Sequence, residues 1–165
     1  MAFNTSFQIA HGIIAVAYNL HRWGIIANPF CHFCTNCPES IEHLFVHCTL
    51  NHLAKHWMLN LVFKSLDYAI TSKDITFGPE IPTDNNNRMI FLLISEYRLA
   101  VWTTRNQAIF ENRRQKARDS LTLLKNRIQL RLQADYIRLG QMIFERQWIE
   151  TGIARKERNV VLLNY

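Results

Sequence analysis

The segment that decides the fold reads Cys31-His32-Phe33-Cys34, followed by Ser40-Ile41-Glu42-His43-Leu44-Phe45-Val46-His47-Cys48. All four cysteines of the 165-residue chain lie between positions 31 and 48. Zn²⁺ prefers four tetrahedral nitrogen and sulfur ligands, and a Cys-x2-Cys turn followed by a His and a further Cys supplies such a set. The spacing therefore predicts a structural Zn²⁺ site with the ligands Cys31, Cys34, His43 and Cys48.

Two further residues compete for a place in this site. Positions five apart on an ideal helix differ by about 140°, so His43 and Cys48 can meet only if the helix opens before Cys48. The alternative is that His47 or Cys37 replaces one of the ligands. Disulfides, which need an oxidising compartment, and buried free thiols explain the pattern less well, because every Cys lies close to a suitably spaced His.

Several short motifs accompany the cysteines: Leu20-His21-Arg22-Trp23-Gly24-Ile25, Glu39-Ser40-Ile41-Glu42-His43-Leu44-Phe45, Trp57 and Trp102-Thr103-Thr104-Arg105-Asn106. Together with the cysteines they resemble the zinc-binding domain that follows the reverse transcriptase in non-LTR (LINE-type) retrotransposons. The chain departs from that family at Ala15-Val16-Ala17-Tyr18, where a Pro-Thr break is common, and at Cys37, where a polar residue is usual. The resemblance implies RNA or DNA as partner, together with the reverse transcriptase domain of the same element.

The net charge of +6 is unevenly distributed along the chain. Residues 1–97 hold five Lys and Arg against seven Asp and Glu, whereas residues 98–165 hold fourteen against six. A basic C-terminal half favours a polyanionic partner such as nucleic acid.

The hydrophobic pattern predicts a mainly α fold, in which a small zinc-stapled turn or hairpin plus helix unit precedes long antiparallel helices. Helices are expected over 7–22, 88–113 and 119–150, and a short strand over 25–33. Prolines, glycine and asparagines predict an irregular linker over 71–87. The expected division is a zinc-binding unit over 1–70, this linker, and a basic helical region over 88–165.

A line of arginines on the helix predicted over 119–150 is the main candidate for phosphate contacts. Evenly spaced guanidinium groups can follow a nucleic-acid backbone; the competing interpretation is that they pair with Asp and Glu of the fold. The zinc unit would add two residues. The predicted nucleic-acid-binding residues are His21, Arg22, Arg127, Arg131 and Arg138.

Apolar and aromatic positions on the long helices suggest other contacts. Leu123, Leu130, Ile137 and Phe144 repeat at seven-residue spacing and would let the helix dock on a polymerase or a second copy of the chain. Trp102 lies between two arginines, either stacking a nucleobase or packing against arginine in a cation–π contact.

Sequence motifs of catalysis are missing from the chain. No two Asp residues are adjacent, no Pro-Asp occurs, and there is no Gly-rich phosphate loop. Four protein ligands also leave no open position on zinc for a reactive water. The expected function is a non-catalytic, nucleic-acid-binding zinc module, with a protein-interaction module as the alternative. No apolar run approaches the length of a membrane span, and the expected location is the nucleus or cytoplasm.

Overall fold

A computed structural model describes residues 2–80, 85–158 and 160–164 of the chain. The described part is mainly helical, with one two-stranded antiparallel sheet. In chain order its elements are α1 (Ala2–Ala10), α2 (Ala17–Arg22), the π-turn η1 (His43–His47), the 3-10 turn η2 (Thr49–Asn51), α3 (His52–Leu66), α4 (Ser72–Phe77), α5 (Asn85–Phe110), α6 (Ala117–Arg138), α7 (Gln141–Phe144), the π-turn η3 (Glu145–Ile149), β1 (Ala154–Glu157) and β2 (Val160–Leu163).

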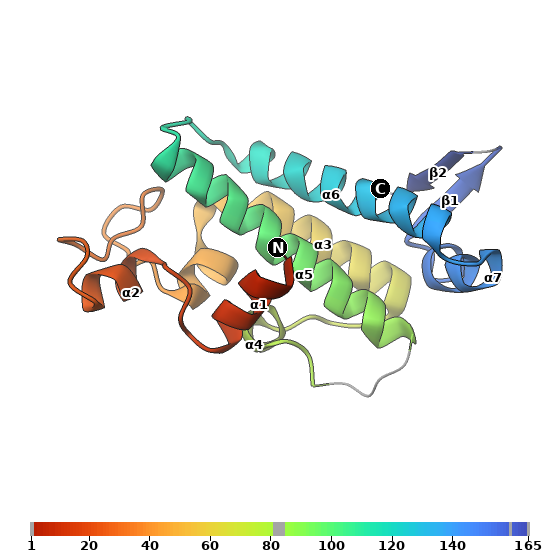
Figure 1. Cartoon of the computed structure of the whole chain (residues 1–165), viewed down its shortest axis with the longest axis horizontal. Helices are drawn as coiled ribbons and strands as arrows, with labels where there is room; N and C mark the ends of the chain where they lie inside the picture. The colour runs from red at the N-terminus through yellow and green to blue at the C-terminus, as the bar shows by residue number, and fades with distance from the viewer. Residues whose placement is uncertain (1, 81–84, 159, 165) are drawn as a thin grey trace.

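The long helix α5 is the centre of the fold. It packs against α6, α3 and α1, and α6 returns antiparallel to it after the connection over 111–116 (Figure 1). The middle of α5, over 93–101, is buried nearly all round, as expected for a helix with apolar residues on every side. The predicted fold class, a small Cys/His unit followed by long antiparallel helices, is confirmed.

The N-terminal helix predicted over 7–22 is divided into α1 and α2. The chain turns at Gly12, whose φ of 67° lies in the left-handed region that glycine adopts without strain. The buried Asn19 side chain holds the break, because its amide donates to the carbonyl oxygens of Gly12 (2.9 Å) and Ile14 (2.8 Å). The prediction of one continuous helix is therefore wrong.

The strand predicted over 25–33 is reduced to a single bridge between Phe30 and Pro38. Around it, the Cys31 amide donates to the Cys37 carbonyl (2.7 Å) and the Glu39 amide donates to the Pro29 carbonyl (2.7 Å). These bonds close a short hairpin-like loop that carries the Cys-x2-Cys turn.

The segment predicted as an irregular linker contains a helix. Thr71 and Asp74 form a capping box at the start of α4, in which the Asp74 carboxylate accepts from the Thr71 amide at 2.8 Å. At its other end, buried Arg98 of α5 donates to the carbonyl oxygens of Ile75 (2.7 Å) and Asp74 (3.3 Å). The prediction of a linker without regular structure is wrong for 72–77, which form α4, and for 85–87, which begin α5; residues 81–84 lie outside the described part.

The last predicted helix, over 119–150, ends early. Leu139 and Gly140 have extended backbone, so α6 stops at Arg138 and the chain folds back through α7 and η3. Buried Trp148 anchors this return by donating from Nε1 to Asp135 (3.3 Å), and β1 and β2 then form an unpredicted hairpin. Because of the break, Phe144 is buried whereas Ile137 is 83% exposed, so these two do not share one surface.

Candidate metal centre

Three thiols and one imidazole converge at the end of the hairpin-like loop. The ligand atoms of Cys31, Cys34, His43 and Cys48 all lie within 4.8 Å of one another. The Cys48 sulfur lies 3.8 Å from the sulfurs of both Cys31 and Cys34. A tetrahedral ion with Zn–S bonds of about 2.3 Å separates its sulfur ligands by about 3.8 Å. The spacing therefore fits a Zn²⁺ ion and is far from the roughly 2.0 Å of a disulfide.

The π-turn η1 explains how His43 and Cys48 meet. The Cys48 amide donates to the His43 carbonyl at 2.7 Å, a bond spanning five residues, and the chain becomes extended at Cys48. This wider turn brings position 48 beneath position 43, which a regular α-helix does not do. The helix thus opens before Cys48, one of the two arrangements that the sequence left open.

The two competing residues lie outside the cluster. His47 is exposed and approaches Glu42 at 3.5 Å, and Cys37 is exposed on the loop. In contrast, the His43 Nε2 atom is buried with no hydrogen-bond partner among the described residues. A buried nitrogen without a partner is costly, and a bound metal ion would satisfy it.

Backbone amides donate hydrogen bonds to two of the sulfur atoms. The Phe33 amide donates to Cys31 (3.4 Å), and the Thr49 amide donates to Cys34 (3.4 Å). The hydrogen bond with Cys48 lowers the pKa of Cys31 to about 5, whereas the same contact and burial raise the pKa of Cys48. A bound dication would displace the thiol protons and hold both sulfurs as thiolates.

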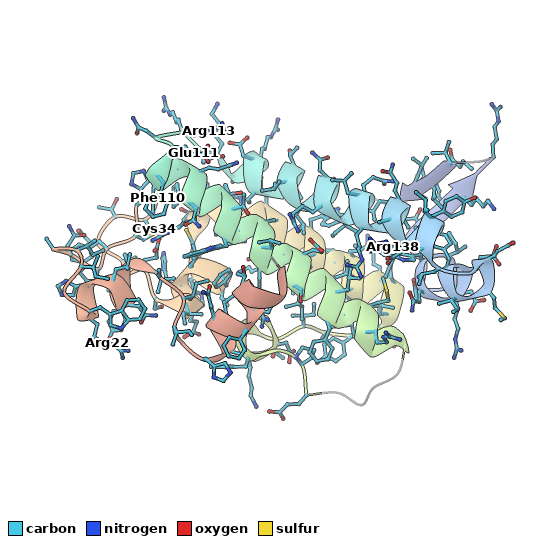
Figure 2. All side chains as sticks on the ribbon, in the orientation of Figure 1. Arg22, Cys34, Phe110, Glu111, Arg113 and Arg138 are labelled. Atoms are coloured by element: carbon cyan, nitrogen blue, oxygen red, sulfur yellow. The ribbon has the colours of Figure 1, made fainter. Side chains whose placement is uncertain are left out.

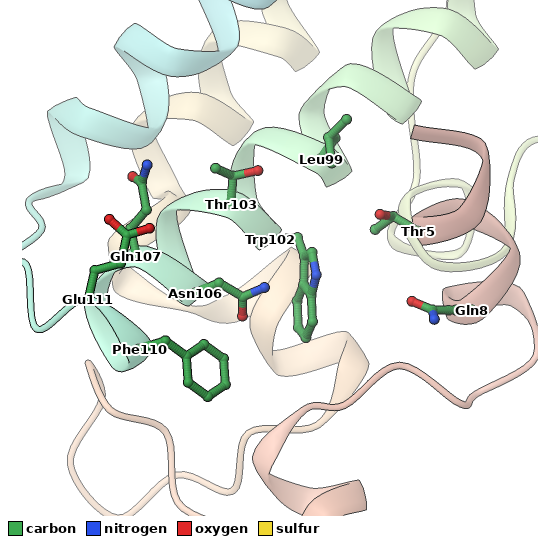
Figure 3. Close-up of a pocket in the computed structure, with 9 residues that line it drawn as sticks. All are labelled: Thr5, Gln8, Leu99, Trp102, Thr103, Asn106, Gln107, Phe110 and Glu111. Carbon is green, nitrogen blue, oxygen red and sulfur yellow. The ribbon is translucent and has the colours of Figure 1, made fainter. Parts of the chain in front are cut away.

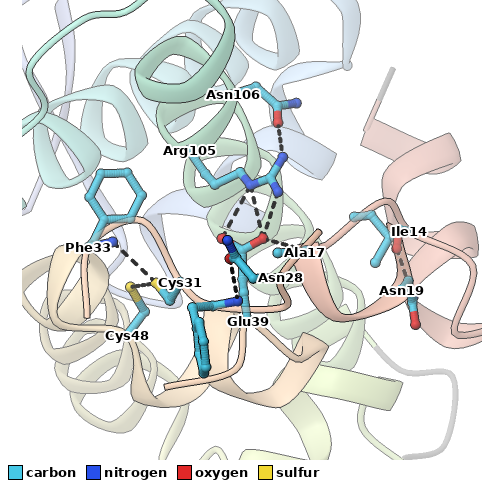
Figure 4. Close-up of polar contacts among 11 residues, drawn as sticks. Ile14, Ala17, Asn19, Asn28, Cys31, Phe33, Glu39, Cys48, Arg105 and Asn106 are labelled. Carbon is cyan, nitrogen blue, oxygen red and sulfur yellow. Dashed lines mark hydrogen bonds and ion pairs between the residues drawn. The ribbon is translucent and has the colours of Figure 1, made fainter. Parts of the chain in front are cut away.

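A buried ion pair connects this unit to α5 (Figure 4). The Arg105 Nη2 atom lies 2.6 Å from Glu39 Oε1, and the two side chains are 2% and 0% exposed. The same oxygen accepts from the Ala17 amide at 2.8 Å, which brings in the start of α2. Glu39 and Arg105 occur in the sequence motifs, but sequence reasoning gave them no joint role.

The predicted nucleic-acid-binding residues do not form one surface. His21 and Arg22 are exposed at the end of α2, whereas exposed Arg138 lies toward the opposite end of the long axis (Figure 2). Arg127 pairs with Glu96 at 2.8 Å and Arg131 pairs with Asp135 at 3.3 Å. Arg127 and Arg131 therefore agree with the competing interpretation, in which the arginines pair with Asp and Glu of the fold.

A denser group of cations lies on the connection between α5 and α6 and on the first turn of α6. Arg113, Arg114, Lys116 and Arg118 are all exposed within six residues. Of these, Arg113 pairs with Glu111 at 2.9 Å. We call these four side chains the basic connection. The excess of Lys and Arg in the C-terminal half was the sequence signal for the basic connection. From the sequence, the phosphate contacts were assigned mainly to the helix predicted over 119–150 instead.

Each of the two arginines expected beside Trp102 has another partner in the fold, and only Arg105 also contacts the indole. Arg98 serves the end of α4, and burial lowers its pKa to about 10. Arg105 holds Glu39 while its guanidinium carbon lies 5.1 Å from the centre of the Trp102 ring. The cation–π interpretation therefore applies to Arg105, and a nucleobase sandwiched between Trp102 and these two arginines does not fit the structure.

The fold and the cluster together define a small helical protein with a candidate Cys₃His metal centre held against a long helix. Residues 3–57 match the family model described as zinc-binding in reverse transcriptase. This match confirms the resemblance to the zinc-binding domain of retrotransposon reverse transcriptases over the cysteine-containing region, and with it zinc as the metal of this family; the motif over 102–106 lies outside the matched residues. No curated protein and no solved structure matches the chain.

Among the described residues, no helix combines the length and the apolar character that a bilayer span requires.

Proposed function

We propose that this protein is a non-catalytic zinc module that binds RNA or DNA through its phosphates. In this proposal Cys31, Cys34, His43 and Cys48 hold a structural Zn²⁺, and all four coordination positions are filled by protein. The ion fixes the Cys-x2-Cys loop, and the Glu39–Arg105 pair transmits that order to α5. Reduced thiolate ligands favour the nucleus or cytoplasm as its location.

The basic connection is the observation that carries the nucleic-acid part of the proposal. Four exposed cations within six residues concentrate positive potential where α5 and α6 meet. Lys and Arg that neutralise phosphates release counterions and give affinity with little sequence preference. His21, Arg22 and Arg138 are exposed basic side chains elsewhere on the surface and would make separate phosphate contacts, whereas Arg127 and Arg131 contribute only where a phosphate displaces Glu96 or Asp135.

Salt dependence tests this proposal. Binding of labelled duplex DNA and single-stranded RNA is measured at several salt concentrations for the parent and for Arg114→Ala with Arg118→Ala. The expected slope of log K against log salt falls by up to about 2 on duplex DNA, since each lost phosphate contact is worth about 0.9. The matched control is Lys64→Ala with Lys73→Ala, which also removes two exposed cations. Equal slopes in both double variants would contradict the assignment of the basic connection.

Exposed apolar side chains support a second candidate function, docking on a protein. Leu130 and Ile137, seven residues apart on α6, are 65% and 83% exposed, and Met142 of α7 is 80% exposed. Exposed apolar side chains such as these fit a polymerase surface or a second copy of the chain. Self-association that persists at high salt and is lost in Leu130→Glu with Ile137→Glu would support the second copy. A monomer at all concentrations would rule it out.

A further inference from the structure

A pocket of about 400 Å³ lies between α1 and the C-terminal third of α5. Its volume falls in the range of about 300–1,000 Å³ that is typical of small-molecule sites. The Trp102 indole stands within it, with Asn106 and Phe110 on one side and Thr5 and Gln8 on the other (Figure 3). None of the four candidate metal ligands lines this pocket, and the zinc site does not account for it.

Two aromatic rings give the pocket flat apolar surfaces. Trp102 is only partly buried, and Phe110 at the end of α5 is 71% exposed. An exposed phenyl ring beside a half-covered indole leaves apolar area in contact with water. Such ring faces bind nucleobases by stacking, with little dependence on base identity.

Side-chain amides supply the polar edge. Asn106 Oδ1 accepts from the Arg105 Nη1 atom at 3.0 Å, which fixes the amide orientation and leaves the NH₂ group as a donor. In Figure 3 this nitrogen points toward the indole. Gln8 offers both a donor and an acceptor from α1. Donors and acceptors at the rim of an aromatic site match the hydrogen-bonding edges of an unpaired base.

The cations of the basic connection, which lie next to the pocket but do not line it, favour a nucleotide over a peptide side chain. Phe110 and Glu111 line the pocket directly before the basic connection, and the Glu111 carboxylate is already paired with Arg113. A strand whose phosphates lie on the basic connection would therefore bring its bases to the pocket mouth. We propose that this pocket holds one unpaired nucleobase of single-stranded RNA or DNA, stacked on Trp102 and Phe110 with Asn106 and Gln8 at its edge. The inference rests on the proposed nucleic-acid binding.

The test compares strands with and without bases on the zinc-loaded full chain. An oligonucleotide and its abasic counterpart of equal length carry the same phosphates, so their affinity ratio isolates the base contribution. We expect the base-bearing strand, as RNA or DNA, to bind roughly ten-fold more tightly. Phe110→Ala should bring this ratio close to one. Phe63→Ala, which removes a ring that is 58% exposed on α3, should leave the ratio unchanged.

The outcomes separate the pocket from the phosphate surface. Equal binding of base-bearing and abasic strands by the parent overturns the pocket while nucleic-acid binding stands. An equal loss of the ratio in Phe110→Ala and Phe63→Ala also overturns it. If no strand and no duplex binds, the proposed function fails, and adenosine titrated against the parent tests the pocket alone. Saturable chemical-shift changes that vanish in Phe110→Ala would then support the pocket, and their absence would overturn it.

Discussion

Cys31 and Cys37 lie on the same short loop but in different surroundings. The Cys31 sulfur is buried 3.8 Å from Cys48, whereas Cys37 is exposed and only its carbonyl oxygen takes part in the loop, as acceptor for the Cys31 amide. A thiolate that completes a tetrahedral site contributes metal-binding free energy, which is folding free energy in such a unit. A thiol outside the site does not.

The first prediction follows from this contrast. Cys31→Ser should lose bound zinc and melt at a clearly lower temperature, whereas Cys37→Ser should keep one Zn²⁺ per chain and melt like the parent. Metal content by elemental analysis and thermal unfolding by circular dichroism provide the measurements. Equal damage from the two substitutions would place Cys37 among the ligands.

Substitution of either residue of the Glu39–Arg105 pair should also have a large effect on the free energy of unfolding. Removing one partner leaves the other charge buried and unpaired, which typically costs about 3–5 kcal/mol. We expect Arg105→Met to lower the free energy of unfolding by this amount. Glu39→Leu with Arg105→Met should be less destabilising than the two single effects added together. Urea unfolding of the four proteins measures the coupling, and simple additivity would contradict the role given to the pair.

At the level of elements, α4 depends on polar contacts at both of its ends. Asp74 accepts from Thr71 at its N-terminus, and Arg98 donates to the Asp74 and Ile75 carbonyl oxygens nearer its C-terminus. Six residues are too few for a stable isolated helix. These contacts, together with the burial of Ile75, therefore stabilise the helical conformation of α4.

The third prediction tests this account of α4. Asp74→Ala should lower the free energy of unfolding by about 1–2 kcal/mol through the lost cap and should open the 72–77 bonds to limited proteolysis. The parent should resist cleavage there. Lys73→Ala is the control, because its pair with Glu80 is at the surface and contributes little. Early cleavage of 72–77 in the parent would contradict a stable α4.

The sequence predicted the long helices well because their apolar repeats are long and regular. It missed α4 and the end of α6, where long-range partners decide the structure. Arg98 stabilises α4 from more than twenty positions away, and Trp148 turns the chain back by binding Asp135. At the metal centre, spacing identified the four converging residues. It could not choose between an opened helix and His47, because the π-turn depends on one hydrogen bond between positions 48 and 43.

On the scale of the whole molecule, one hydrophobic core draws on both ends of the chain. Leu44 and Phe45 of the zinc unit are fully buried in the same cluster as Ile94 and Tyr97 of α5. The Tyr97 hydroxyl donates to the Phe45 carbonyl at 2.6 Å, and the Glu39–Arg105 pair joins the same two parts farther along α5. The division into units over 1–70 and 88–165 stays a prediction, and this shared core argues that the two parts fold together.

The fourth prediction is that zinc release and helix loss occur in one transition. Urea unfolding of the zinc-loaded chain is followed by a chromogenic zinc indicator and by far-ultraviolet circular dichroism, and the midpoints should coincide as in a cooperative unit. Because Arg105→Met removes a link between the zinc unit and α5, it should shift zinc release to lower urea than helix loss. Lys64→Ala, an exposed change on α3, should keep the midpoints together. Separate transitions in the parent would mean that the zinc unit and the basic helices are independent, despite the core that they share.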